Sequence, residues 1–444
     1  MFYINKETPL SDALLHKLIN QFQTTELPKL KRWGDYYNGI QKILNKSYSD
    51  PTKECNHIIT NMCKTIVDTY AGYICGKPIT YTSNGDISDV QSVINYNDSS
   101  SEDYEWLSNS LIYSVGYELY WIDAYSQVRY SQISPLCGFP IYDNSMDQEL
   151  LYFVRWYKED SFSDNDNYFV EVYDKFSIKV YKSIGLNGAF TFIEEKAHYF
   201  KDVPVSVFWL NTQEQNIFNS IISLQDAYND LQSGEIDSFN AWVDSYLVLT
   251  NCDAGEDELM FMKESRTMIL PKDSTATFLT KNVSDTQISN MLENIRKNIY
   301  KITACPDTSD EVFMAQSGEA IKWKLTGFEN VASGIVAKMT KAIQKRIELI
   351  CNILNLKATD TIWRDIDIQF TRNLPTNNTE LISLVQNLQG IVSSETLLSL
   401  LPFVKDTTAE LEKLNKEKQA NMALYGFGTS QFESDEDDEN SQNM

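Results

Sequence analysis

Two long stretches with the apolar periodicity of an α-helix flank a short β-prone segment, and this arrangement most constrains how the chain can fold. In residues 216–249, and again in residues 285–304, apolar side chains recur every three or four positions, as on one face of a helix. The intervening residues contain two strand-like runs, 267–270 and 276–280. Two striped helices joined by a small β unit bury little apolar surface by themselves. We therefore expect them to pack against neighbouring molecules.

The N-terminal part of the chain combines helical and strand-like patterns. Residues 10–46 predict two helices, with Ile40 among the apolar anchors of the second. Residues 58–74 place apolar side chains on one stripe and predict a further helix. Gly76 suits the end of that helix and Pro78 prevents its continuation. The residues that follow alternate in the manner of a strand.

The rest of the pattern predicts an α+β fold. Residues 102–115 should be helical, and residues 117–183 contain short aromatic-rich runs typical of antiparallel strands. A third long helix is expected over 319–355, followed by a strand at 365–370. Three shorter helices complete the predicted order, at Glu380–Leu388, Ser394–Leu401 and Thr407–Ala420. The acidic residues after Gly428 have the composition of a disordered tail.

Composition and charge argue against several functional classes. The chain of 444 residues has a formal net charge of −24, so it cannot coat a nucleic acid by neutralising phosphates, which requires clustered Lys and Arg. The sequence has no apolar run long enough for a membrane span, and its first ten residues lack the pattern of a signal peptide. We expect no membrane partner. The seven cysteines form no C-x-x-C pair and are expected to be free thiols in a reducing compartment.

Charge is concentrated in two regions of opposite sign. Residues 202–262 contain no Lys, Arg or His. Their eleven carboxylates belong to Asp202, Glu214, Asp226, Asp230, Glu235, Asp237, Asp244, Asp253, Glu256, Asp257 and Glu258. The third long helix instead groups Lys338, Lys341, Lys345 and Arg346. Such groups are commonly no more than solvated surface charge. The alternative is that acidic and basic helices face each other across subunits.

No constellation of residues predicts catalysis, and we expect no cofactor and no metal. The Gln-Ser-Gly run at 316–318 lacks the flanking glycines of a nucleophile elbow. Asp365 and Asp367 could ligate a metal, but they alternate with isoleucines as in an ordinary strand. The carboxylates of residues 253–258 do not match the frame of a calcium loop, and a surface turn is the simpler interpretation.

Five stretches, in this order, resemble the portal proteins of tailed phages, in particular the SPP1-like portal family of siphophages. The stretches are RWGDYYNGIQKI (32–43), NMCKTIVDTYAGYICGKPITY (61–81), SLQDAYNDLQSGEID (223–237), DEVFMAQSGEAIKWKL (310–325) and GIVSSETLLSLLPFVKDTTAELEKL (390–414). The resemblance extends from about residue 30 to about residue 420.

The resemblance implies a ring, usually of twelve identical subunits, at one vertex of the capsid. Double-stranded DNA passes through the axial channel of such a ring without sequence specificity, driven by a separate terminase motor, so the ring itself is not an enzyme. The implied partners are further copies of the chain, the terminase large subunit, the major capsid and scaffolding proteins, and the head-tail connector proteins. The implied location is the virion, with assembly in the host cytoplasm. An acidic channel would repel phosphate and let DNA slide.

The parts of a portal subunit can be carried over onto this chain. They are a wing (1–215), two stem helices (216–249 and 285–305), a clip between the stem helices (250–284), a tunnel loop (306–318), a bent wing helix with a strand (319–378) and a helical crown (379–421). The acidic tail at 422–444 is not part of the recognised pattern.

Two sets of candidate site residues follow from this assignment. The tunnel loop holds Asp307, Asp310, Glu311, Phe313, Met314 and Gln316. Its acids would keep the contact with DNA weak. The clip holds Asp253, Glu256, Asp257 and Glu258. We expect this acidic cluster to be exposed and to help dock the motor or a connector.

Two other classes of function stay open on the sequence alone. One is a metal-dependent nuclease, or another phosphoryl-transfer enzyme, that uses Asp365, Asp367 or the carboxylates of residues 253–258. The other is a monomeric adaptor that binds a peptide or a protein.

Overall fold

A computed structural model describes residues 1–50, 53–160, 166–243, 246–251, 255, 260, 272–279, 285–307, 318–354, 362–373, 385–399, 410–411 and 413–417. The chain divides into two units, residues 1–373 and residues 374–444, which are described separately. Three predicted features lie outside the described residues: the strand at 267–270, most of the tunnel loop, and the acidic tail. The described part mixes helices and sheets, as the sequence predicted.

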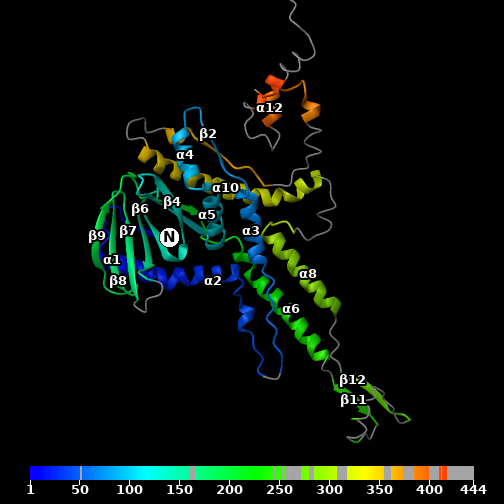
Figure 1. Ribbon diagram of the computed structural model, residues 1–444. Helices are drawn as coiled ribbons and strands as arrows, with labels where there is room; N and C mark the ends of the chain where they lie inside the picture. The colour runs from blue at the N-terminus through cyan, green and yellow to red at the C-terminus, as the bar shows by residue number, and fades with distance from the viewer. Residues whose placement is uncertain are drawn as a thin grey trace, which may run out of the picture. The chain divides into compact units, whose positions relative to one another are not determined.

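A six-stranded sheet forms one layer of the first unit (Figure 1). Its order is β1 (Phe2–Ile4), β5 (Gly138–Asp143), β6 (Leu150–Lys158), β7 (Asn167–Tyr173), β8 (Ser177–Ile184) and β9 (Thr191–Ala197). Neighbouring strands are antiparallel except β1, which runs parallel to β5. The antiparallel region was predicted, whereas the edge strand β1 was not, because three residues show no readable alternation.

A three-stranded antiparallel sheet lies between this layer and the helices. Its order is β10 (Val205–Trp209), β3 (Val115–Ile122) and β4 (Val128–Ile133). On one face Phe208 meets Trp106 of helix α5 (Ser99–Tyr113), with ring centroids 6.0 Å apart. On the other face Tyr117 meets Phe153 of the six-stranded sheet at 5.0 Å. Both faces of the small sheet are therefore covered.

The first helices end earlier than the sequence predicted. Helix α1 (Asp12–Gln21) begins at the cap Ser11 and continues through a π-helical turn into α2 (Leu27–Tyr37). Gly39 then turns the chain with a φ of +83°, a conformation that suits glycine. Ile40, predicted as an apolar anchor, lies beyond this turn and is 57% exposed. That prediction was wrong because the helix stops before the residue can reach the core. A short helix, α4 (Ser88–Tyr96), precedes α5.

The predicted helix at 58–74 is also shorter at its start. Helix α3 spans Met62–Cys75, and the side chain of its cap Asn61 accepts a hydrogen bond from the Lys64 N–H at 3.2 Å. Residues 58–61 are extended instead, and their backbone donors bind side chains of another helix. The predicted stop is confirmed, because a Cβ on Gly76 would lie 2.1 Å from the carbonyl oxygen of Gly72. Strand β2 (Thr80–Thr82) follows and pairs with β13 (Asp367–Gln369).

Two of the three long helices were predicted nearly correctly. Helix α8 spans Asp285–Ile302 and α10 spans Gly318–Leu354. Helix α6 spans Ile222–Val243, so it begins later than residue 216, after a 3-10 turn at Asn219–Ile221, and does not reach residue 249. Residues Tyr246–Thr250 form strand β11, paired with β12 (Thr275–Leu279). The aromatic and β-branched residues here pair across strands, which the helical periodicity alone could not reveal.

The second unit contains short helical segments. Helix α12 spans Ser394–Ser399, and residues 385–388 and 413–417 are also helical. Each segment lies inside one of the three stretches that were predicted as helices. Among the described helices of the chain, none combines the length and apolar character that a membrane crossing needs.

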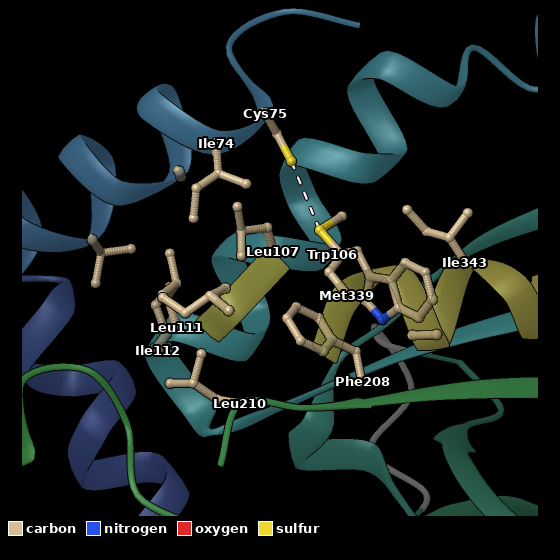
Figure 2. Close-up of a cluster of buried hydrophobic side chains, with 14 of the residues drawn as sticks. Ile74, Cys75, Trp106, Leu107, Leu111, Ile112, Phe208, Leu210, Met339 and Ile343 are labelled. Atoms are coloured by element: carbon tan, nitrogen blue, oxygen red, sulfur yellow. Dashed lines mark hydrogen bonds between the residues drawn. The ribbon is translucent and has the colours of Figure 1, made fainter. Parts of the chain in front are cut away.

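The centre of the first unit is an apolar cluster where α3, α5, α10 and β10 meet (Figure 2). Trp106 and Leu111 come from α5, Phe208 from β10, and Met339 from α10, and each is at most 1% exposed. The thiol of Cys75 on α3 lies 3.8 Å from the sulfur of Met339. Burial raises the pKa of this thiol, which suits an inert core cysteine.

A buried ion cluster adjoins this core. Arg346 of α10 is fully buried, and its Nε and Nη2 donate to Glu118 of β3 at 2.8 and 2.7 Å. The same Nη2 lies 2.6 Å from Asp103 of α5. The hydroxyl of Tyr120 donates to Glu118 as well. Burial raises the pKa of Asp103, and the Arg346 guanidinium opposes this rise. Arg346 is thus an internal residue and not part of an exposed basic face.

We expect Arg346→Met to lower the free energy of unfolding by about 3–5 kcal/mol, because it leaves two buried carboxylates without their cation. The matched control is Lys341→Met on the exposed face of the same helix, which should change stability by no more than ~0.5 kcal/mol. Denaturant unfolding followed by circular dichroism measures both. Equal effects of the two substitutions would show that the cluster does not stabilise the fold.

Candidate functional site

Helices α6 and α8 form a pair that this chain alone does not cover. They run next to each other (Figure 1) and pack through Tyr228 of α6 and Ile299 of α8, which are 9% and 0% exposed. Other apolar side chains on the described part of the pair are exposed: Ile236 is 41% exposed, Met291 51% and Ile302 53%. Exposed apolar surface of this kind marks an interaction site. The helix pair is therefore the first candidate surface for another subunit.

Helix α6 is fastened to the body by a ladder of side-chain-to-backbone hydrogen bonds. Backbone N–H groups of every second residue in the extended segment 56–62 donate to side chains of every fourth residue of α6. The donor–acceptor pairs are Asn56 with Asp237 (2.8 Å), Ile58 with Ser233 (3.0 Å), Thr60 with Asn229 (3.1 Å) and Met62 with Gln225 (3.2 Å). We call this arrangement the α6 ladder.

The register of the α6 ladder holds because two residues of extended chain and four residues of helix advance by nearly the same distance. Two residues of extended chain advance about 6.6 Å, and four residues of α-helix advance about 6.0 Å. The mismatch of roughly 0.6 Å per step is small enough for side chains to absorb over the length of the segment. The extended segment is thereby held parallel to the helix axis, in a fixed register.

The middle of the ladder is buried and fully engaged. Gln225, Asn229 and Ser233 are each 0% exposed. The amide of Gln225 donates to the Thr60 carbonyl at 2.7 Å, and that of Asn229 donates to the Gln41 side chain at 2.6 Å. Removing one of these side chains leaves buried donors and acceptors without partners, which is costly.

The α6 ladder was not predicted from the sequence, where the apolar stripe of residues 216–249 was the pattern used for this helix. One pattern in the sequence could have revealed it. Four polar side chains that can accept a hydrogen bond follow one another at a spacing of four residues: Gln225, Asn229, Ser233 and Asp237. A helix that is to face water has no need for such spacing.

The chain before the predicted tunnel loop and the helix after it both pack on helix α3. A Cβ on Gly327 would lie 3.9 Å from the Cβ of Ala304, so the chain before the loop and helix α10 run close together there. The Tyr70 hydroxyl donates to the carbonyl of Thr303 at 2.8 Å. The ring of Phe328, ten residues into α10, lies 4.5 Å from that of Tyr70 and 4.7 Å from that of Tyr73. Helix α3 therefore holds the chain just before the loop, and it holds α10 at Phe328.

Asp307, the first predicted loop acid, forms an ion pair within its own chain. Its carboxylate lies 3.1 Å from Nη1 of Arg296 on α8, and the side chain is 16% exposed. Arg296 also pairs with Glu293 at 3.0 Å. The hydrogen bond with Glu293 raises the pKa of Arg296, and the same bond lowers the pKa of Glu293. The charge of Asp307 is thus largely compensated.

The other predicted site residues lie outside the described part of the chain. In the loop these are Asp310, Glu311, Phe313, Met314 and Gln316. In the clip they are Asp253, Glu256, Asp257 and Glu258. Their roles stay predictions.

Several carboxylates of the acidic stretch 202–262 also have partners within the chain. Asp202 pairs with Lys345, Glu214 accepts from the N-terminal amine of Met1 at 3.1 Å, and Asp230 lies 3.0 Å from Lys46. The Tyr36 hydroxyl donates to Asp226 at 2.8 Å. These acids already have partners within their own chain, although the Asp230 side chain stays 63% exposed. Pairing of acidic and basic helices across subunits stays a prediction.

The residues of the alternative enzyme reading do not assemble a metal site in the described structure. Asp365 ends a 3-10 turn and Asp367 begins β13, and both are exposed. Ile366 between them is 3% exposed, as the predicted in-out alternation requires. Among the described residues, no three His, Cys, Asp or Glu side chains gather closely enough to hold a metal ion.

Comparison with known proteins gives a consistent answer along nearly the whole chain. Residues 15–423 match the model of the family described as Phage portal protein, SPP1 Gp6-like. The portal protein of Bacillus phage SPP1 is 23% identical over 448 aligned positions, which cover 93% of this chain and 88% of the relative. The portal protein of Clostridium phage phiCD119 is 24% identical over 420 positions, covering 87% and 92% respectively.

The α6 ladder leads to a local prediction. Asn229→Ala leaves the Thr60 N–H and the side-chain oxygen of Gln41 without the partners they have in Asn229, at a cost of about 1–3 kcal/mol. If the segment opens locally, amides of residues 56–62 should exchange with deuterium roughly ten- to a hundredfold faster. Ser223→Ala, at an exposed position of the same helix, is the control and should leave exchange unchanged. Equal protection in the Asn229 variant would show that the ladder does not hold the segment.

Proposed function

The chain belongs to the phage portal protein family, SPP1 Gp6-like, and from this membership we propose that it assembles into a ring at one vertex of a phage capsid. The ring serves as the channel for DNA packaging and ejection. The family is one of structural proteins and not of enzymes. The observation that carries the proposal beyond membership is the uncovered apolar surface on the α6–α8 pair, which a closed ring of identical subunits would bury.

We assign the parts of the described chain accordingly. The sheets and the helices before α6 form the wing, and α6 and α8 are the stem helices. The paired strands β11 and β12 belong to the clip, and α10 is the long wing helix. The helical segments between residues 385 and 417 belong to the crown. The α6 ladder then joins stem to wing within one subunit.

The proposed partners follow from the position of such a ring. Further copies of the chain, twelve in all, pack through the stem. The clip, with Asp253, Glu256, Asp257 and Glu258, docks the terminase large subunit and later the head-tail connector. The major capsid and scaffolding proteins surround the ring, placing the protein in the virion after assembly in the host cytoplasm.

Electrostatics supports a channel that lets DNA slide. A chain with a net charge of −24 offers duplex phosphates few cations to bind. The proposed tunnel loop contains no Lys or Arg between residues 306 and 318. Because Arg296 compensates Asp307, the repulsive charge of the loop falls on Asp310 and Glu311.

Ring formation is tested by mass. Light scattering or native mass spectrometry of the purified chain at micromolar concentration should show a closed species many times the 51.0 kDa subunit mass. Replacing exposed stem residues Met291 and Ile302 with Glu should shift the distribution towards monomer, while Tyr125→Glu, at an exposed turn of the wing, should not. A well-folded monomer at every salt concentration would contradict the ring.

The channel assignment of the loop is tested by charge reversal. Asp310→Lys with Glu311→Lys should leave rings intact but slow or stall DNA passage, most severely at low salt, because each new phosphate contact strengthens binding. The readout is packaged DNA length per particle over time, with rings checked by microscopy. Packaging at the wild-type rate at every salt concentration would remove these acids from the channel wall.

A further inference from the structure

Strand β10 forms one edge of the three-stranded sheet, and its outer side carries unused backbone groups. In an antiparallel pair, successive residues bond alternately towards the partner and away from it. The carbonyl of Pro204 accepts from Tyr120 N–H at 3.0 Å, and Leu210 N–H donates to Ser114 at 2.9 Å. Residues Val207 and Trp209 therefore direct their N–H and C=O groups outward. Within the described structure, no hydrogen bond reaches these outward groups.

A groove of about 450 Å³ opens along this edge. Val207 and Trp209 line its base, Lys338 and Lys341 of α10 line one side, and the β5–β6 turn with Asp147 lines the other. A further strand would lie about 4.8 Å from β10, between the helix layer and the six-stranded sheet. The groove thus continues the sandwich in which the three-stranded sheet already lies.

The wall formed by α10 is positively charged. Lys338 and Lys341 are exposed, and no ion pair joins either of them to a described residue. Lys345, one turn further on, is occupied by Asp202 and by Glu348 at 2.9 Å. Two uncompensated lysines on one wall of a groove are unusual in a chain with a net charge of −24.

The acids of the opposite wall are partly used. Lys6 forms an ion pair with Glu149, and the N-terminal amine of Met1 pairs with Glu214. Asp147 is the remaining acid of the turn that lines the groove. The local charge that an incoming segment meets on the α10 side is therefore positive.

We propose that this groove binds an extended acidic segment of another protein, which adds a fourth strand to the β10–β3–β4 sheet and places carboxylates on Lys338 and Lys341. Backbone pairing with Val207 and Trp209 supplies affinity in such strand addition, and the side chains select the sequence. The inference goes beyond ring formation, since it concerns the wing and does not depend on how subunits contact one another.

The competing explanation is that the lysines only protect an open edge. Lysine on an edge strand or beside it prevents edge-to-edge aggregation. A strand as short as β10 needs little further protection against such pairing. In that case the groove has no occupant, and an acidic strand would not bind. A second alternative is that the lysines bind nucleic acid, which would need no backbone pairing.

The experiment uses fluorescence anisotropy with the full-length protein in its native assembly. The probe is a labelled peptide of alternating Glu and Val, about seven residues long to match a typical strand. Its controls are the same peptide with alternate amides N-methylated, an alternating Lys and Val peptide, and a single-stranded oligonucleotide. We expect the acidic peptide to bind at least about tenfold more tightly than each control, because only it offers both charge and a pairing edge.

Two variants locate the binding. Lys338→Glu with Lys341→Glu should weaken the acidic peptide by about tenfold, whereas Lys17→Glu with Lys175→Glu, at exposed lysines elsewhere, should not. Val207→Pro removes one outward N–H and leaves the inward pairing of β10 intact, so it should weaken binding without loss of circular dichroism signal.

The proposal is overturned by any of three results. They are no binding of the acidic peptide, equal binding of its N-methylated form, and equal binding to the Lys338/Lys341 variant. Tighter binding of the oligonucleotide than of the peptide would also overturn it, in favour of nucleic acid.

Discussion

The buried contact of Arg346 with Glu118 and Asp103 determines how the rest of the first unit can be arranged. It joins the middle of α10 to α5 and β3, and buried charges accept only a narrow geometry. Phe328 lies eighteen residues earlier on α10, which is five turns and places it on the same face, roughly 27 Å away. Once Arg346 is in place, Phe328 of the same helix meets Tyr70 and Tyr73 of α3.

The apolar period predicted the helices that pack by an apolar face. It gave wrong helix bounds where tertiary hydrogen bonds determine the backbone conformation. The bounds of α8 and α10 were predicted nearly correctly from the apolar period. Ile58 and Ile59 continue the stripe of α3 in sequence, yet Ile58 donates its N–H to Ser233, 175 residues away. A tertiary bond of this kind overrides local propensity. The same limit applies at Tyr246–Thr250, where pairing with a distant strand replaces the last turns of a helix.

In the candidate site, too, the features that depend on apolar periodicity could be predicted and those that depend on tertiary hydrogen bonds could not. The helices α6 and α8 could be predicted, since apolar residues recur along each of them with a helical period. The α6 ladder could not, because polar residues on a helix are most often solvated and only their spacing of four distinguished these. The compensation of Asp307 could not be predicted either, as Arg296 is eleven positions earlier and on the far side of a helix end.

These partners would change how the acidic composition acts in the proposed DNA channel. Acids of α6 such as Asp226, Asp230 and Asp237 accept hydrogen bonds or ion pairs from residues packed beside the helix. At physiological salt any charge, paired or not, contributes little to the potential beyond a Debye length of about 8 Å. The net charge of −24 of the whole chain is therefore no measure of the field at one point of such a channel. The sliding of DNA through it would depend on which few acids face the axis and not on the total.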